Sequence, residues 1–145
     1  MKEIKESKTL DLLQTIMEFE LAGVLRYAHY SLVVNDATDR DSIVDFLKDQ
    51  ADESLEHAIR VGEMLKAVNG YPKFGICGVE ELSDYSSKSI LIASLAHEKK
   101  ALEMYRLLLE TAEGVVPSVA TFAHNMITEE GGHFHELQEL VNNYP

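Results

Sequence analysis

The stretch Glu129-Glu130-Gly131-Gly132-His133 lies in a segment whose apolar residues recur at helical spacing. On a helix, Glu130 and His133 leave the same face about one turn apart, close enough to share one metal ion. The apolar residues of that face are Met126, Ile127, Phe134, Leu137 and Val141. A carboxylate within this stripe would cost several kcal/mol without a partner. The pattern therefore predicts a buried helix face on which Glu130 meets a metal ion or another cation.

The composition of the 145 residues is typical of one globular domain, which we place at residues 1–145. The net charge of −12 argues against a nucleic acid partner and suits either attraction of metal cations or a solvated surface. Cys77 is the only cysteine, so one chain can form neither a disulfide nor a cysteine-based metal cluster. No apolar run approaches about 18 residues, and the N-terminus lacks the apolar region of a secretory signal. We therefore expect a cytoplasmic protein without a membrane partner.

Apolar residues at spacings of three and four predict four helices and no strand. The second helix follows a capping box formed by Thr38 and Asp41, and it ends before Asn69-Gly70. Gly114 ends the third helix and Pro117 opens the fourth. The four predicted helices span approximately residues 9–34, 39–68, 85–112 and 117–142.

The segment 69–84 joins the second and third helices and has no helical period. Pro72, Gly75 and Gly78 lie close together in it, which indicates an irregular connection. Short loops join antiparallel helices, whereas a link of this length can cross the bundle and leave its flanking helices parallel. The expected fold class is all-α, a four-helix bundle with a long crossover between helices two and three.

The two halves of the chain repeat one arrangement of polar residues within their apolar stripes. In each half, one helix carries a glutamate with a tyrosine seven residues later, and the next helix carries a glutamate shortly before a histidine. In order, these residues are Glu20 and Tyr27, Glu53 and His57, Glu98 and Tyr105, and Glu130 and His133. The first glutamate precedes the histidine by 37 residues in the first half and by 35 in the second. We expect the two halves to direct matching side chains at one point in the core.

Four carboxylates and two imidazoles in a bundle core suit two divalent metal ions about 3.5–4 Å apart. Carboxylates can bridge two ions, and imidazole suits iron. The predicted ligands are Glu20, Glu53, His57, Glu98, Glu130 and His133. Other interpretations stay open: the glutamates could pair with buried arginines, the histidines could make structural hydrogen bonds, and the two tyrosines could be core aromatics.

Four groups of residues carry a resemblance to a known family. They are Phe19-Glu20-Leu21 with Arg26-Tyr27, His57-Ala58, His97-Glu98-Lys99-Lys100-Ala101 with Met104-Tyr105, and Glu129-Glu130-Gly131-Gly132-His133. Their order and spacing resemble the ferritin-like superfamily, and bacterioferritin most closely, from Leu10 to Val141. The resemblance implies a ferritin-like bundle with a ferroxidase centre of two iron ions per chain, for which manganese or zinc can substitute in preparations. It also implies Fe(II) and either O2 or hydrogen peroxide as reactants, and a role in iron storage.

The resemblance also implies a role for each predicted ligand. Glu20 and Glu130 are terminal ligands, and His57 and His133 each supply one nitrogen to one iron. Glu98 and a glutamate of helix two are the bridges, and Tyr27 donates a hydrogen bond to the centre.

The chain departs from the family pattern in helix two. The family motif is Glu-x-x-His, but Ser54 stands three residues before His57 and Glu53 stands four before. Because a step of four residues stays on the same helix face, we keep Glu53 as a bridging ligand.

Two further departures concern haem and assembly. Bacterioferritins bind haem through a methionine two residues before the helix-two histidine, and this chain has Leu55 there, so we expect no haem. The chain also ends soon after the fourth helix, without the short fifth helix of many cage-forming ferritins. This puts the largest ferritin cages in doubt, and we expect a homo-oligomer that is either a dimer or a larger cage.

Three other functions share parts of this pattern. A rubrerythrin-like peroxidase has the same site but usually carries a cysteine-rich domain, for which Cys77 alone does not suffice. A miniferritin-type, DNA-independent iron detoxifier has a spacing similar to Asp49-x-x-x-Glu53, but its site lies between subunits and needs histidines early in helix one, where this chain has none before His29. A degenerate bundle without metal would serve only oligomerisation, and metal content separates it from the enzymes.

Two expectations concern residues around the motifs. His29, His97, His124 and His135 are expected at the surface or beside the centre, and His97 is the one most closely linked to it because it precedes Glu98. Gly131-Gly132 inside a helix costs about 1 kcal/mol per glycine relative to alanine. The retained glycines therefore predict close packing, a distorted turn beside the site or ordinary helix contact.

Overall fold

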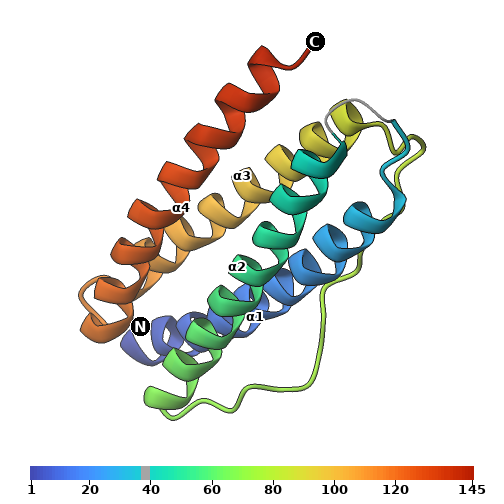
Figure 1. Cartoon of the computed structure of the whole chain (residues 1–145). Coiled ribbons are helices and arrows are strands. Elements are labelled where there is room, and N and C mark those ends of the chain that lie inside the picture. Colours follow the sequence, from blue (N-terminus) through green and yellow to red (C-terminus); the bar gives the residue numbers. More distant parts are fainter. Residues whose placement is uncertain (37–39) are drawn as a thin grey trace.

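The computed structural model describes residues 1–36 and 40–145, and all regular structure in these residues is helical. The helices are α1 (Lys2–Val33), α2 (Arg40–Ala67), α3 (Ser87–Ala112) and α4 (Pro117–Asn143). One face of each helix is apolar and packs on its neighbours. The predicted all-α four-helix bundle is confirmed (Figure 1). None of the described helices combines the length and apolar content that crossing a bilayer requires.

The helices form two antiparallel hairpins joined by the predicted crossover (Figure 1). The hairpins are α1 with α2 and α3 with α4, and α1 also packs against α3. The crossover, residues 68–86, runs back along the bundle, so that α2 and α3 point in the same direction. It is fixed to α1, because Cys77 N donates to the carbonyl of Glu18 at 3.2 Å and Lys73 N donates to Gln14 Oε1 at 2.9 Å.

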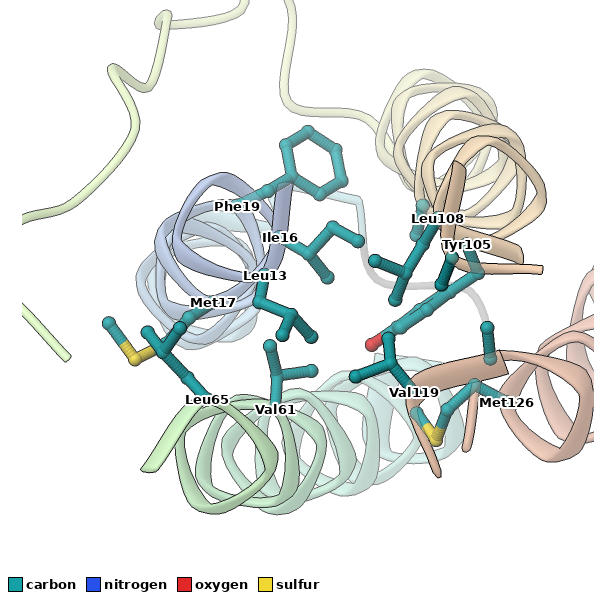
Figure 2. Packing of buried hydrophobic residues seen from close by; sticks show 13 residues of the cluster. Leu13, Ile16, Met17, Phe19, Val61, Leu65, Tyr105, Leu108, Val119 and Met126 are labelled. Carbon is teal, nitrogen blue, oxygen red and sulfur yellow. The ribbon is translucent and has the colours of Figure 1, made fainter. Parts of the chain in front are cut away.

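Buried apolar residues form two clusters at different heights in the bundle. One cluster lies in the first halves of α1 and α4 and the second halves of α2 and α3, and Figure 2 shows its packing. Its larger members are Leu13, Ile16, Val61, Leu65, Tyr105, Leu108, Val119 and Met126. The other cluster contains Tyr27, Tyr30, Val34, Ile43, Leu47, Ile90, Leu91 and Leu137. The predicted glutamates and histidines lie between these two clusters along every helix, so they form a polar layer between two apolar ones.

Two helix boundaries differ from the prediction. α1 begins at Lys2 rather than at residue 9, because residues 2–8 are exposed and mostly Lys and Glu, which favour helix but leave no apolar period. α3 begins at Ser87 rather than at residue 85, because Ser86 Oγ accepts a hydrogen bond from Ser89 N at 3.2 Å and caps the helix. Thr38 and the predicted start of helix two at residue 39 lie outside the described residues.

The two glycines of the α4 motif do not mark a close contact between helices. A Cβ added at Gly131 or Gly132 would meet no other element of the described chain within 4 Å. Gly23 in α1 is the opposite case, because a Cβ there would lie 2.7 Å from His97 Nε2 and 3.0 Å from Ser54 Oγ. Close packing at Gly131-Gly132 within the chain was therefore a wrong expectation, whereas Gly23 is a true close approach between helices.

These glycines predict opposite responses to alanine. Gly131→Ala and Gly132→Ala should each raise the free energy of unfolding by about 0.5–1 kcal/mol, because alanine favours helix and meets open space. Gly23→Ala should lower it, because the new methyl group displaces a buried ring. Urea unfolding followed by circular dichroism measures all three. A loss of stability in the α4 variants would instead mean that another chain packs against this turn in an assembly.

Candidate metal centre

The structure brings all six predicted ligands into the polar layer, and each helix contributes at least one. Glu20 comes from α1, Glu98 from α3 and Glu130 from α4, and each is at most 4 % exposed. His57 of α2 is 1 % exposed. The four groups come from segments far apart in the sequence, and the antiparallel hairpins place them at one height.

Three of these residues form a compact group. His57 Nδ1 lies 3.1 Å from Glu20 Oε2 and 2.9 Å from Glu130 Oε1. One nitrogen or oxygen atom from each of the three residues lies within 4.8 Å of the others, which is the arrangement that a single metal ion requires. Two carboxylates and one imidazole leave further coordination positions open for another ligand or water. The compact group therefore fits one divalent ion.

The other α2 and α4 ligands form a second, more open group. Glu53 Oε1 lies 2.6 Å from His133 Nδ1, and their side chains are 24 % and 33 % exposed. Ser54, which stands at the family's glutamate position, is 3 % exposed and lies beside Gly23. Glu53 therefore stays on the side of α2 that faces α4 and contacts its histidine. Its role as a bridging ligand stays a prediction.

Two tyrosines cross between the halves of the bundle. The Tyr27 hydroxyl of α1 donates to Glu98 Oε1 of α3 at 2.5 Å, and the Tyr105 hydroxyl of α3 donates to Glu20 Oε2 of α1 at 2.8 Å. Each tyrosine thus donates a hydrogen bond to the glutamate of the other half of the chain. The hydrogen bond of Tyr27 to the centre was predicted, whereas Tyr105 remained a candidate core aromatic, although its seven-residue spacing from Glu98 repeats that of Tyr27 from Glu20.

Burial and close contacts shift the pKa values of three groups in the polar layer. Burial raises the pKa of Glu20, and burial together with the neighbouring carboxyl of Glu130 raises the pKa of Glu98 well above its usual range. Burial by itself lowers the pKa of His57, but its contacts with Glu130 and Glu20 outweigh that effect and raise the pKa to about 11. At neutral pH the His57 ring is therefore a positively charged imidazolium, and its Nδ1 contacts the carboxyl groups of Glu20 and Glu130.

Several buried polar atoms of the centre lack a hydrogen-bond partner among the described residues. They are His57 Nε2 and Glu130 Oε2, together with His133 Nδ1, which lies 2.6 Å from Glu53 Oε1 without a well-aligned hydrogen bond. Leaving a buried polar atom without a partner costs about 1–3 kcal/mol. Metal coordination would use Glu130 Oε2 and His133 Nδ1, whereas His57 Nε2 faces Glu129 and leaves Nδ1 as the nitrogen of the compact group.

An ion pair that the sequence did not predict borders the compact group. Arg60 Nη1 of α2 donates to both carboxylate oxygens of Glu129 at 3.0 and 3.1 Å, and Glu129 Oε1 lies 3.8 Å from His57 Nε2. Partial burial opposes ionisation of Glu129, but Arg60 outweighs it and lowers the carboxyl pKa. The ion pair therefore joins α2 and α4 beside the Nε2 edge of His57.

The comparisons with known proteins agree with this architecture. A family model described as a ferritin-like domain matches residues 10–145. The chain belongs to the ferritin-like family. A search of curated proteins found no match.

Solved structures of ferritin-like proteins share the fold at low sequence identity. A ferritin-like diiron-carboxylate protein from Bacillus anthracis has a TM-score of 0.85 at 19% identity, over 94% of this chain and 97% of that chain. A dodecameric thioferritin from Bacteroides fragilis, described as bacterioferritin-related, has a TM-score of 0.83 at 20% identity, over 94% and 86%. Dps from Thermosynechococcus elongatus has a TM-score of 0.85 at 13% identity, over 97% and 94%. At these identities the matches show the ferritin-like fold and do not separate its subfamilies.

The structure of this ferritin-like chain also places the remaining histidines. His29, His124 and His135 are exposed, whereas His97 is 4 % exposed. Burial and the nearby Arg26 lower the pKa of His97 to about 3. The His97 ring lies edge-on to Tyr27, with ring centroids 5.7 Å apart, so it is a close neighbour of the centre.

Metal binding at this centre should release protons. Metal ligands must be deprotonated, and His57 holds its proton at neutral pH because its pKa is about 11. We expect about one proton or more to be released per chain when Zn(II) or Co(II) binds at pH 7, and the apparent affinity to rise with pH. Calorimetric titrations in two buffers of different ionisation enthalpy measure the release. Equal apparent enthalpies in both buffers would contradict the proton-holding network.

Proposed function

We propose that the chain is a di-iron ferroxidase of bacterioferritin type, which binds Fe(II) in pairs, oxidises it to Fe(III) with O2 or hydrogen peroxide, and passes it to an iron store. One observation carries the proposal: four carboxylates and two imidazoles from all four helices gather in one largely buried layer of a ferritin-like bundle. Such a set suits two ions of a metal that changes oxidation state, because carboxylates can bridge ions and imidazole suits iron.

The chain's own residues divide the binding of two Fe(II) ions between them. Glu20, His57 and Glu130 hold the first ion in the compact group. Glu53 and His133 hold the second at the edge of the layer, and Glu53 is the proposed bridge to the first. Glu98 interacts with Glu130 and accepts a hydrogen bond from Tyr27, which supports Glu98 as a bridging ligand. Every ligand comes from one chain, which supports a centre within the subunit.

The reaction balances with Fe(II) as substrate. Two Fe(II) ions give two electrons to O2, which takes up two protons and becomes hydrogen peroxide; two further Fe(II) ions reduce peroxide to two waters with two more protons. The buried carboxylates stabilise the higher charge of Fe(III) relative to Fe(II). Glu53 and His133 are partly exposed, which supports the edge of the layer as the place where iron arrives and leaves.

The alternatives differ from this proposal in testable ways. A miniferritin function is supported by the fold match to Dps, but a site between subunits would not place all six residues together in one chain. A rubrerythrin-like peroxidase would need an electron source outside these 145 residues, because Cys77 alone cannot form a cysteine cluster. A metal-free oligomerisation module would bind no iron.

Neutral replacements of the buried carboxylates test the proposal. Glu98→Gln and Glu130→Gln should abolish fast aerobic Fe(II) oxidation, followed by absorbance, and the wild type should bind about two irons per chain. Circular dichroism should show that both variants keep the bundle. Glu103→Gln is the matched control on α3, because Glu103 is exposed and outside the layer, and its rate should equal that of the wild type. Unchanged rates in the Glu98 and Glu130 variants would place the chemistry elsewhere.

We also propose that the chain forms a homo-oligomer through the α1 and α2 hairpin. Leu25 and Leu32 lie seven residues apart on α1 and are 53 % and 77 % exposed, and Leu55 and Ile59 lie four apart on α2 and are 43 % and 53 % exposed. Residues at these spacings share a helix face, and exposed apolar faces favour association. The similar thioferritin is dodecameric. The absence of haem at Leu55 stays a prediction.

Size-exclusion chromatography with light scattering tests this interface. The wild type should elute as an oligomer, and the double variant Leu32→Ser with Ile59→Ser should shift to lower mass, because it removes apolar area from both helices. Leu107→Ser on α3 is the control, since Leu107 is also exposed, at 48 %, but lies on the other hairpin. An unchanged mass in the double variant would exclude the α1 and α2 face.

A further inference from the structure

The buried polar atoms that lack hydrogen-bond partners fall into two groups. Among the described residues there are six such atoms, and three of them belong to the metal centre. The other three are Arg26 Nε and both ring nitrogens of His97. Metal ions at the centre would not satisfy the positively charged Arg26. An acceptor outside the chain, either a water molecule or an anion, would satisfy the Arg26 donor.

Arg26 and His97 line a pocket between α1 and α3 that is separate from the metal centre. The pocket has a volume of about 250 Å³ and is lined by Phe19, Arg26, Ala93, Ala96, His97 and Lys100, which we call the Arg26 pocket. None of the six predicted metal ligands lines it. Its volume is below the range of about 300–1,000 Å³ that is typical of pockets for drug-sized ligands, so it suits a small occupant.

Packing holds His97 in place at the base of this pocket. Its ring stacks on Phe19, with centroids 4.2 Å apart and planes at 11°. At the Nε2 edge of the ring, Gly23 allows α1 to approach so closely that an added Cβ would lie 2.7 Å from that nitrogen. The ring cannot turn freely to find solvent. The His97 ring is thus a fixed part of the pocket lining, and its Nε2 faces Gly23 of α1.

The charge of the Arg26 pocket is opposite to that of the chain as a whole. The sequence has 13 Lys and Arg against 25 Asp and Glu, yet two cations and no carboxylate line this pocket. Among the described residues no carboxylate forms an ion pair within 4.0 Å of Arg26 or Lys100. Glu80 and Glu81 line only a neighbouring depression that Arg26 also borders.

The Arg26 guanidinium is also held in position. Its Nη1 donates to the Tyr30 hydroxyl oxygen at 3.1 Å, which leaves the buried Nε without an acceptor. A guanidinium presents several N–H donors in a fixed plane and matches the oxygens of phosphate and carboxylate groups. Lys100 adds a mobile ammonium group at the rim.

We propose that the Arg26 pocket binds a small oxyanion of the phosphate type. Its oxygens would accept hydrogen bonds from the Arg26 guanidinium and from the Lys100 ammonium group, which are the two cations of the lining. The bound anion would neutralise the positive charges of Arg26 and Lys100. This site does not depend on the proposed ferroxidase activity.

Titration of the full chain with inorganic phosphate tests the site. Metal ions are first removed with a chelator and dialysis, so that phosphate cannot bind to iron. Calorimetry and ³¹P NMR line widths should show saturable binding of one phosphate per chain. Arg26→Gln and Lys100→Gln should each weaken it about tenfold or more, since each removes one charged donor. Lys99→Gln is the matched control, because it makes the same charge change one residue away and Lys99 does not line the pocket; it should bind as the wild type does.

Three results would overturn the proposal. The first is no saturable binding up to about 10 mM phosphate, ten times a weak dissociation constant of about 1 mM. The second is equal weakening by Lys99→Gln and Lys100→Gln, which would indicate diffuse charge attraction. The third is unchanged phosphate binding in Lys100→Gln. Because Lys100 is exposed, this variant should fold normally, so it tests the proposal even if circular dichroism shows that Arg26→Gln is misfolded. None of these results bears on Fe(II) oxidation, so the two proposals fail independently.

Discussion

The structure depends on how a layer of ionisable groups is held between two apolar layers. Glu20, His57, Glu98 and Glu130 are almost completely buried, and isolated charges at such positions would be strongly unfavourable. The contacts of His57 with two carboxylates compensate part of that cost, and the tyrosine hydroxyls compensate another part. Bound cations would compensate the remaining cost of burial. The arrangement that destabilises the fold without metal therefore suits a metal centre.

The sequence predicted the fold and the set of candidate ligands for one physical reason. A helix repeats every 3.6 residues, so a glutamate such as Glu20 or Glu98 that lies within an apolar stripe must face the core. The repeat of this pattern in both halves placed the groups at matching heights. The glycines and the one proline of the crossover indicated a long irregular connection, and its length predicted the parallel arrangement of α2 and α3, which brings the halves together.

Contacts between helices could not be predicted in the same way. Glu53 and Ser54 are both compatible with the helical period, and only the packing of α2 on α1 shows that Ser54 is buried and that Glu53 faces His133. The Arg60 and Glu129 ion pair spans 69 residues of sequence, and neither residue interrupts an apolar stripe. His97 precedes a candidate ligand, but its stacking on Phe19 depends on the distance between α1 and α3.

The crossed tyrosines make each hairpin incomplete without the other. Tyr27 of the α1 and α2 hairpin donates a hydrogen bond to Glu98 of the α3 and α4 hairpin. Tyr105 of the α3 and α4 hairpin donates one to Glu20 of the α1 and α2 hairpin. A hairpin that folded alone would lack this partner and would expose its share of both apolar clusters to water. Folding and assembly of the polar layer are therefore one cooperative event. The crossover is the tether that gives the second hairpin a high effective concentration beside the first.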